Sequence, residues 1–139
     1  MLYQASCVAI GGRAVLIEGP PGAGKTSLAL ALIDRGASLV GDDGVRLERR
    51  GTRLFATPPP NIAGRIEIRN VGIVHLPCVE APVALLLRLD PDAPRYIEGA
   101  ESETLGSVPI PRIAFASAHA ADAIRAEYAL RLHGIDVAG

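Results

Sequence analysis

Short apolar or alternating runs, separated by Gly, Pro and Asp, dominate the chain and favour β-strands over helices. The expected strands cover residues 4–10, 14–18, 38–40, 45–48, 53–56, 66–69, 72–76, 83–89 and 110–115. Apolar residues recur at helical spacing over residues 25–35, which end before a capping glycine, Gly36. A second helix is expected over 118–132, with Ala120, Ile124, Tyr128 and Leu132 along one face.

The connections between these segments indicate how the strands pair. Gly11-Gly12 joins the first two strands by a link too short for a helix, so they are expected to form an antiparallel hairpin. Arg50-Gly51 indicates a second hairpin, and the apolar run 83–89 is expected to be buried on both faces. Residues 57–61 and the Pro-, Gly- and acid-rich residues 90–107 are expected to be loops. The pattern predicts an α/β fold with a mixed, partly antiparallel sheet and few helices.

Composition limits the class of protein. A length of 139 residues suits one domain, expected to span 1–139, and 49% hydrophobic residues are enough to form a core. The net charge of −1 and the lack of a basic block argue against binding to nucleic acid or to a membrane surface. The sequence shows no membrane-spanning run and no signal-peptide pattern at its start, so a cytoplasmic location is expected. Cys7 and Cys78 are expected to be small buried apolar residues.

The strongest motif lies between the second expected strand and the first expected helix. It consists of Gly19, Pro20, Pro21, Gly22, Ala23, Gly24, Lys25 and Thr26. This glycine spacing, followed by Lys and Thr, is that of a P-loop, in which backbone N–H groups and a helix N-terminus surround phosphate oxygens. Lys25 is the only lysine in the chain and would lie against the outer phosphates, while the Thr26 hydroxyl would bind Mg²⁺. We therefore expect ATP and Mg²⁺ as ligands.

Two further motifs carry carboxylates. Asp42 and Asp43 follow the strand that comes after the P-loop helix, a position that faces the phosphates in many P-loop proteins. One carboxylate could lie near the metal while the other accepts a proton from an attacking hydroxyl; the alternative is a solvated acidic turn. Glu67 and Arg69 share one face of a strand, and by themselves they favour a surface ion pair.

Taken together, these motifs resemble the HPr kinase/phosphorylase family, in the short form that consists of the catalytic domain alone. The resemblance rests on the P-loop within 16–26, Arg35-Gly36 at the helix end, the double aspartate within 39–45 and Glu-Ile-Arg within 67–73. It covers roughly residues 4–115 and implies a P-loop kinase that phosphorylates a serine of an HPr-like phosphocarrier protein. It also implies assembly into a homo-hexamer.

The resemblance implies roles for individual residues. The proton acceptor falls on Asp43, with Asp42 beside it, and the metal positions fall on Thr26 and Glu67. A functional arginine of the family falls on Arg95. Together with Lys25, these residues form the expected catalytic and metal-binding set.

The chain also departs from the family pattern. Gln4 stands where the family has a histidine, and Asn70 replaces a glycine, although asparagine tolerates a positive φ. Residues 116–119 lack the basic character of the segment used for dephosphorylation, so kinase activity is favoured over phosphorylase activity. Two alternatives stay open: an ATPase or small-molecule kinase on the same scaffold, and a non-catalytic nucleotide sensor.

Overall fold

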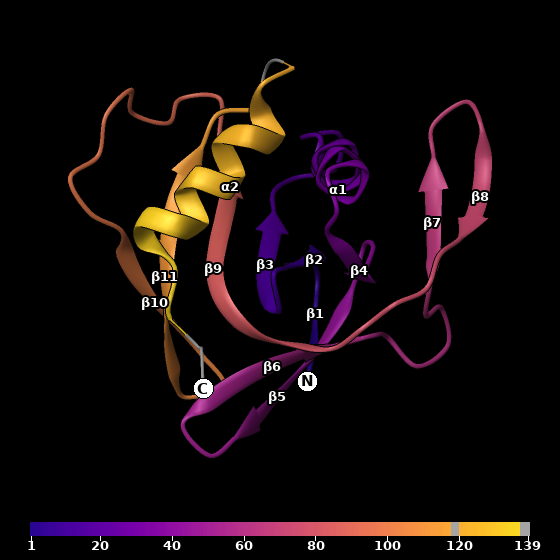
Figure 1. Cartoon of the computed structure of the whole chain (residues 1–139), viewed down its shortest axis with the longest axis horizontal. Helices are drawn as coiled ribbons and strands as arrows, with labels where there is room; N and C mark the ends of the chain where they lie inside the picture. The colour runs from indigo at the N-terminus through magenta and orange to yellow at the C-terminus, as the bar shows by residue number, and fades with distance from the viewer. Residues whose placement is uncertain (118–119, 137–139) are drawn as a thin grey trace.

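The computed structural model describes residues 1–117 and 120–136, which form a curled mixed sheet with two helices on one face (Figure 1). The helices are α1 (Lys25–Asp34) and α2 (Asp122–His133). The strands are β1 (Leu2–Tyr3), β2 (Ser6–Ile10), β3 (Arg13–Glu18), β4 (Ser38–Gly41), β5 (Val45–Arg50), β6 (Arg53–Thr57), β7 (Arg65–Ile68), β8 (Gly72–His75), β9 (Ala81–Leu89), β10 (Glu101–Leu105) and β11 (Val108–Phe115). The expected mixed α/β fold is confirmed.

The long strand β9 connects the parts of the main sheet, whose order is β1-β5-β6-β9-β3-β2-β4. Strand β9 runs parallel to β3 along one edge. Along its other edge it pairs first with β6, antiparallel, and then with β11, parallel. Figure 1 shows β9 bending between these partners, so that the hairpin β5–β6 crosses below the rest of the sheet. Both predicted hairpins, β2–β3 and β5–β6, are present.

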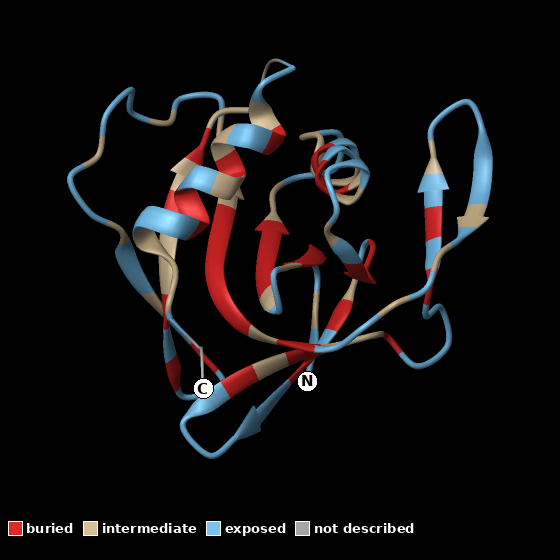
Figure 2. Ribbon diagram, in the orientation of Figure 1, coloured by how far each residue is buried: buried red, intermediate tan, exposed pale blue. Residues whose placement is uncertain are grey.

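The two faces of the sheet carry separate apolar clusters. Figure 2 shows that β3 and β9, which contribute to both clusters, are mostly buried. Alternate residues of each strand point to opposite faces, so Ile17 packs under α1 and α2 while Leu16 packs inside the curl. Strand β9 is buried on both faces, as its continuous apolar run predicted. The P-loop strand β3 lies between these clusters and is packed on both faces.

Three sequence expectations about strands and cysteines need correction. Residues 101–105 lie within the expected loop 90–107 but form strand β10, which pairs with β11 through a turn whose Gly106 and Ser107 have positive φ. The first expected strand is interrupted: Gln4 lies between β1, which pairs with β5, and β2. Cys7 is buried as expected, but Cys78 is only half-buried.

Helix α2 buries a different face from the one that its apolar spacing suggested. Ala123, Ala126, Ala129 and Leu130 face the core, while Ile124, Tyr128 and Leu132 are exposed. Small alanine side chains allow the helix to approach the sheet closely, which outweighs the larger side chains on the outer face. The helix begins at Asp122, and the expected first residues Ala118 and His119 lie outside the described residues.

Strands β7 and β8 pair with each other as a hairpin that projects beside α1 and not as part of the main sheet (Figure 1). Asn70 lies in the turn between β7 and β8 and has φ of 67°, a conformation that asparagine tolerates well. Ile66 is fully buried at the base of the hairpin, whereas Val71 and Ile73 are exposed near its tip.

No helix in the described part of the chain is long and apolar enough to span a membrane.

Candidate functional site

The P-loop connects the end of β3 to the first turn of α1, as the motif predicted. Gly24 caps the helix with φ of 103°, a conformation that favours glycine, and the helix starts at Lys25. The ammonium of Lys25 donates hydrogen bonds to the carbonyl oxygens of Gly19 (2.8 Å) and Pro20 (3.2 Å). The lysine therefore lies across the loop. The first turn of a helix leaves backbone N–H groups without partners inside the helix, so the N-terminus of α1 at the loop suits an anion.

The two aspartates at the end of β4 have different environments. Asp42 is 7% exposed, and its Oδ1 accepts hydrogen bonds from Ser6 Oγ at 3.0 Å and Thr26 Oγ1 at 2.9 Å. Asp43 is exposed and has φ of 63°. Gly41 makes this turn possible, because a Cβ there would lie 2.4 Å from the Gly44 carbonyl oxygen. The buried carboxylate is thus fixed on the P-loop threonine, and the exposed one is free to meet solvent or substrate.

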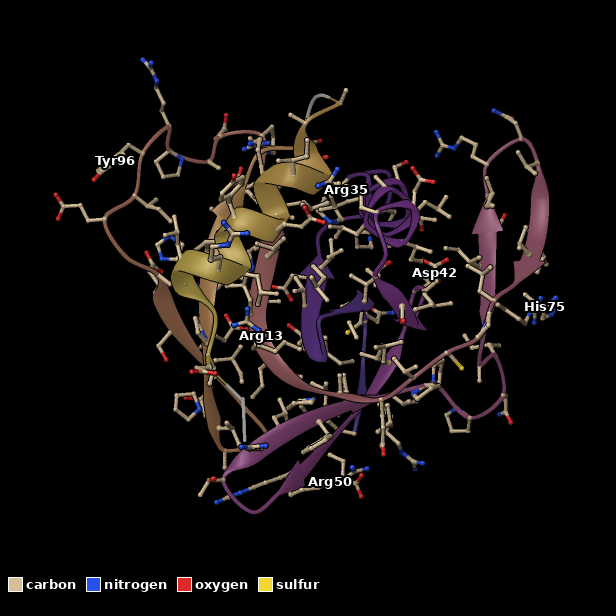
Figure 3. The ribbon with its side chains drawn as sticks, viewed as in Figure 1. Arg13, Arg35, Asp42, Arg50, His75 and Tyr96 are labelled. Atoms are coloured by element: carbon tan, nitrogen blue, oxygen red, sulfur yellow. The ribbon has the colours of Figure 1, made fainter. Side chains whose placement is uncertain are left out.

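The P-loop, the aspartates and the β7–β8 hairpin face a common cleft of about 1040 Å³. Figure 3 shows Asp42 at the end of β4, on the side of α1 that faces this hairpin. The hairpin contributes Glu67 together with two arginines, Arg65 and Arg69. Glu67 thus lines the same cleft as Lys25 and Asp43. Its position is not simply that of a surface ion pair with Arg69, which its sequence spacing favoured. Carboxylates, a lysine and a hydroxyl from separate segments meet around a space large enough for a nucleotide.

The donor set of the cleft fits Mg²⁺. Thr26 and Asp42 are joined by a hydrogen bond, and both present oxygen atoms, the ligand type that Mg²⁺ requires; Glu67 adds a further carboxylate to the lining. The described residues hold no cluster of three or more His, Cys, Asp or Glu side chains that could bind a metal alone.

Two residues singled out from the sequence lie elsewhere. Arg95 is exposed in the segment between β9 and β10 and does not line the cleft. Its neighbour Tyr96 is on the opposite side of the view from Asp42 (Figure 3). Gln4 lines a second hollow of about 360 Å³, together with Glu18, Gly19 and Arg88, and not the cleft that holds Asp43.

Ser6 was missed by the sequence analysis. It is fully buried in β2 and donates to the Asp42 carboxylate from 36 positions away in the chain. A serine inside an apolar strand gives no local signal of this contact. Only the pairing of β2 with β4, in which Cys7 is opposite Gly41, brings the two side chains together.

Comparison with known proteins agrees with this geometry. The family model described as "HPr Serine kinase C-terminal domain" matches residues 1–79. The HPr kinase/phosphorylase of Clostridium acetobutylicum is 33% identical over 104 residues, which is 72% of this chain and 34% of that protein. The HPr kinase/phosphorylase of Chlorobium phaeobacteroides is 40% identical over 76 residues, 53% of this chain and 24% of that protein.

A solved structure matches over almost the whole chain. The Hpr(Ser) kinase/phosphatase from Coxiella burnetii superposes with a TM-score of 0.82 at 28% identity, covering 94% of each chain. By contrast, the chain spans between 21% and 34% of the length of the curated relatives it matches. The family match includes the P-loop, both aspartates and the β7–β8 hairpin. The chain belongs to the HPr serine kinase C-terminal domain family.

Proposed function

We propose that this chain is an ATP- and Mg²⁺-dependent kinase that phosphorylates a serine of an HPr-like phosphocarrier protein. One observation supports this most directly: a single cleft collects a P-loop lysine, an exposed aspartate and a buried aspartate bonded to the P-loop threonine. The names of the matching relatives support the choice of kinase chemistry and of HPr as the acceptor. The chain would act in the cytoplasm and, as in the family it resembles, as a homo-hexamer.

The residues of the cleft divide the work of phosphoryl transfer. Backbone N–H groups of the P-loop and Lys25 would hold the phosphates of ATP and offset their charge. Asp43, exposed at a fixed turn, would accept the proton of the serine hydroxyl as the oxygen attacks the terminal phosphorus. Thr26, Asp42 and Glu67 would hold Mg²⁺, which when bound neutralises charge on the phosphates. Ser6 keeps Asp42 oriented toward Thr26.

Arg95 does not fit this division of work within one chain, because it lies outside the cleft. An acceptor protein or a second copy of the chain could meet it from outside. We therefore assign it no role in nucleotide binding. Replacing Arg95 with Ala should leave the affinity for ATP unchanged, and its effect on transfer should be measured separately.

The test is transfer of labelled phosphate from ATP to the HPr-like protein, measured beside ATP binding. We expect Lys25→Ala to weaken ATP binding and abolish transfer while the chain stays folded, since the lysine lies at the P-loop and not in the core. Asp43→Asn should keep MgATP binding and slow transfer by about a hundredfold or more, the contribution of a general base. Asp92→Asn, an exposed aspartate outside the cleft, is the matched control.

Each outcome decides between the open alternatives. Free phosphate without a labelled protein would indicate an ATPase or a kinase with a different acceptor. ATP binding with neither product would favour a sensor. Near-normal turnover in Asp43→Asn would show that Asp43 is not the base.

A further inference from the structure

A row of polar side chains crosses the sheet at the edge where the P-loop begins. It starts at Tyr3 near the N-terminus and continues through Glu18 of β3 and Arg88 of β9. It ends on the outer hairpin with Glu103 of β10 and Arg112 of β11. Glu18 and Arg88 are direct partners in the parallel register of β3 and β9. The row therefore links the strand that carries the P-loop to four other strands, β1, β9, β10 and β11.

Both carboxylate oxygens of Glu18 have a donor. Arg88 Nε donates to Oε1 at 2.5 Å, and the Tyr3 hydroxyl donates to Oε2. The Glu18 side chain is 16% exposed. Burial, and then the hydrogen bond to Glu18, raise the pKa of Tyr3, so that its hydroxyl stays protonated and remains a donor. Glu18 is consequently held in one position although it lies at the surface of the sheet.

Arg88 is the shared member of the row. Its Nη2 donates to Glu103 Oε1 at 2.9 Å while its Nε holds Glu18, and Arg112 Nη1 donates to the same Glu103 oxygen at 2.7 Å. A planar guanidinium can address two carboxylates in fixed directions at once, which a lysine ammonium does less well. Loss of Arg88 would leave Glu18 and Glu103 without the cation that they share.

Glu18 is the last residue before the P-loop, and the contacts of the next residue lead to Lys25. The carbonyl oxygen of Gly19 accepts the hydrogen bond from Lys25 Nζ at 2.8 Å. Gly19 also packs closely on the end of β9, since a Cβ there would lie 3.1 Å from Leu89 Cβ. The relative position of β3 and β9 at Glu18 and Arg88 thus determines where the Gly19 carbonyl lies.

We propose that Arg88 is a positioning residue for the P-loop: by fixing Glu18 against β9 it sets the Gly19 carbonyl and, through it, the Lys25 ammonium. Arg88 lines the smaller hollow, beside Gly19 and Pro20, and not the cleft that holds Lys25 and Thr26, so it would act without touching the phosphates. This proposal rests on the proposed binding of ATP at the P-loop. It makes ATP binding depend on a residue outside the P-loop motif, Arg88.

The test compares ATP binding by calorimetry in Arg88→Met, Arg88→Lys and a control, Arg50→Met. Arg50 is a matched control because it also bridges two carboxylates, Glu48 at 2.8 Å and Glu80 at 2.7 Å. Its side chain is 40% exposed, against 43% for Arg88, and it lies on the β5–β6 hairpin far from α1 (Figure 3). The unfolding temperature of each variant is measured in parallel.

We expect Arg88→Met to weaken ATP binding by about threefold to thirtyfold, the range of a coupled network, and to raise KM for ATP more than it lowers kcat. Arg50→Met should lower the unfolding temperature about as much as Arg88→Met does. It should leave the affinity for ATP unchanged. Arg88→Lys should recover less than half of the loss, because it keeps the charge and not the two directed hydrogen bonds.

Two results would overturn the inference. Unchanged ATP affinity in Arg88→Met would mean that the row only stabilises the sheet. Full recovery in Arg88→Lys would mean that the charge of residue 88 matters and its geometry does not. If the unmodified protein fails to bind ATP, the proposed function fails instead, so the two failures are distinguishable.

Discussion

Replacing Asp42 separates its structural role from its role at the metal. In Asp42→Ala, Ser6 and Thr26 both lose their acceptor. A hydrogen bond to a charged group contributes about 1.5–3 kcal/mol. The two bonds do not simply add, because half-buried Thr26 can turn to water and removal of the carboxylate relieves its own desolvation. Ser6 is fully buried, so its hydroxyl cannot turn to water instead. We therefore expect the free energy of unfolding to fall by about 2–4 kcal/mol.

The matched change is Asp42→Asn. An amide oxygen placed where Oδ1 lies can still accept from both hydroxyls, so this variant should lose less stability than Asp42→Ala. It lacks the negative charge, and we therefore expect a higher Mg²⁺ requirement for ATP binding.

The assay is thermal unfolding with and without MgATP, combined with Mg²⁺ titration of ATP binding. A loss of about 2–4 kcal/mol corresponds to a fall in unfolding temperature of about 7–14 °C for a protein of 139 residues. The reasoning would be refuted if the two variants unfolded at the same temperature. An unchanged Mg²⁺ requirement in Asp42→Asn would remove Asp42 from the metal site.

Three further predictions concern other parts of the molecule. Gly41→Ala should displace the Asp42 turn, because its Cβ meets the Gly44 carbonyl; Mg²⁺-dependent ATP binding should fall. Ile66→Ala should loosen the β7–β8 hairpin at a cost of about 2–5 kcal/mol, seen as faster hydrogen exchange there and not across β9. Hydrogen bonds from Arg112, and then from Arg88, lower the pKa of Glu103. The ionised Glu103 therefore stabilises the fold above about pH 4.5, and this contribution is lost as pH falls through the folded-state pKa. Urea unfolding of Glu103→Gln should accordingly depend less on acid than that of the unmodified protein.

Much of the fold could be predicted from the sequence because its signals are local. The P-loop requires a strand before it and a helix after it, and β3 and α1 lie there. Gly11-Gly12 gave a hairpin because so short a link leaves no alternative. Strand β10 was missed because its acidic and polar residues, Glu101 among them, alternate without the apolar pattern of a buried strand.

Features that depend on distant partners could not be predicted. The buried face of α2 consists mainly of alanines, and which side of an Ala-rich helix is buried depends on the sheet beneath it. The same is true of the candidate site. The position of Lys25 and the two aspartates in one cleft follows from motif order. The support that Ser6 and Arg88 give to them arises only from strand pairing, between β2 and β4 and between β3 and β9.

The dependence of β3 on β9 has a consequence for how the chain reaches its native state. Every described residue that lines the cleft lies within the first 79 residues, yet β9 begins only at Ala81. As the chain leaves the ribosome, the P-loop strand is complete long before its parallel partner exists, and the backbone N–H and C=O groups along one edge of β3 are unpaired during that interval. Closing so long a loop slows folding, and the open edge is a site for wrong pairing between nascent chains. A fragment that keeps all the cleft residues but ends before β9 should therefore not form the site.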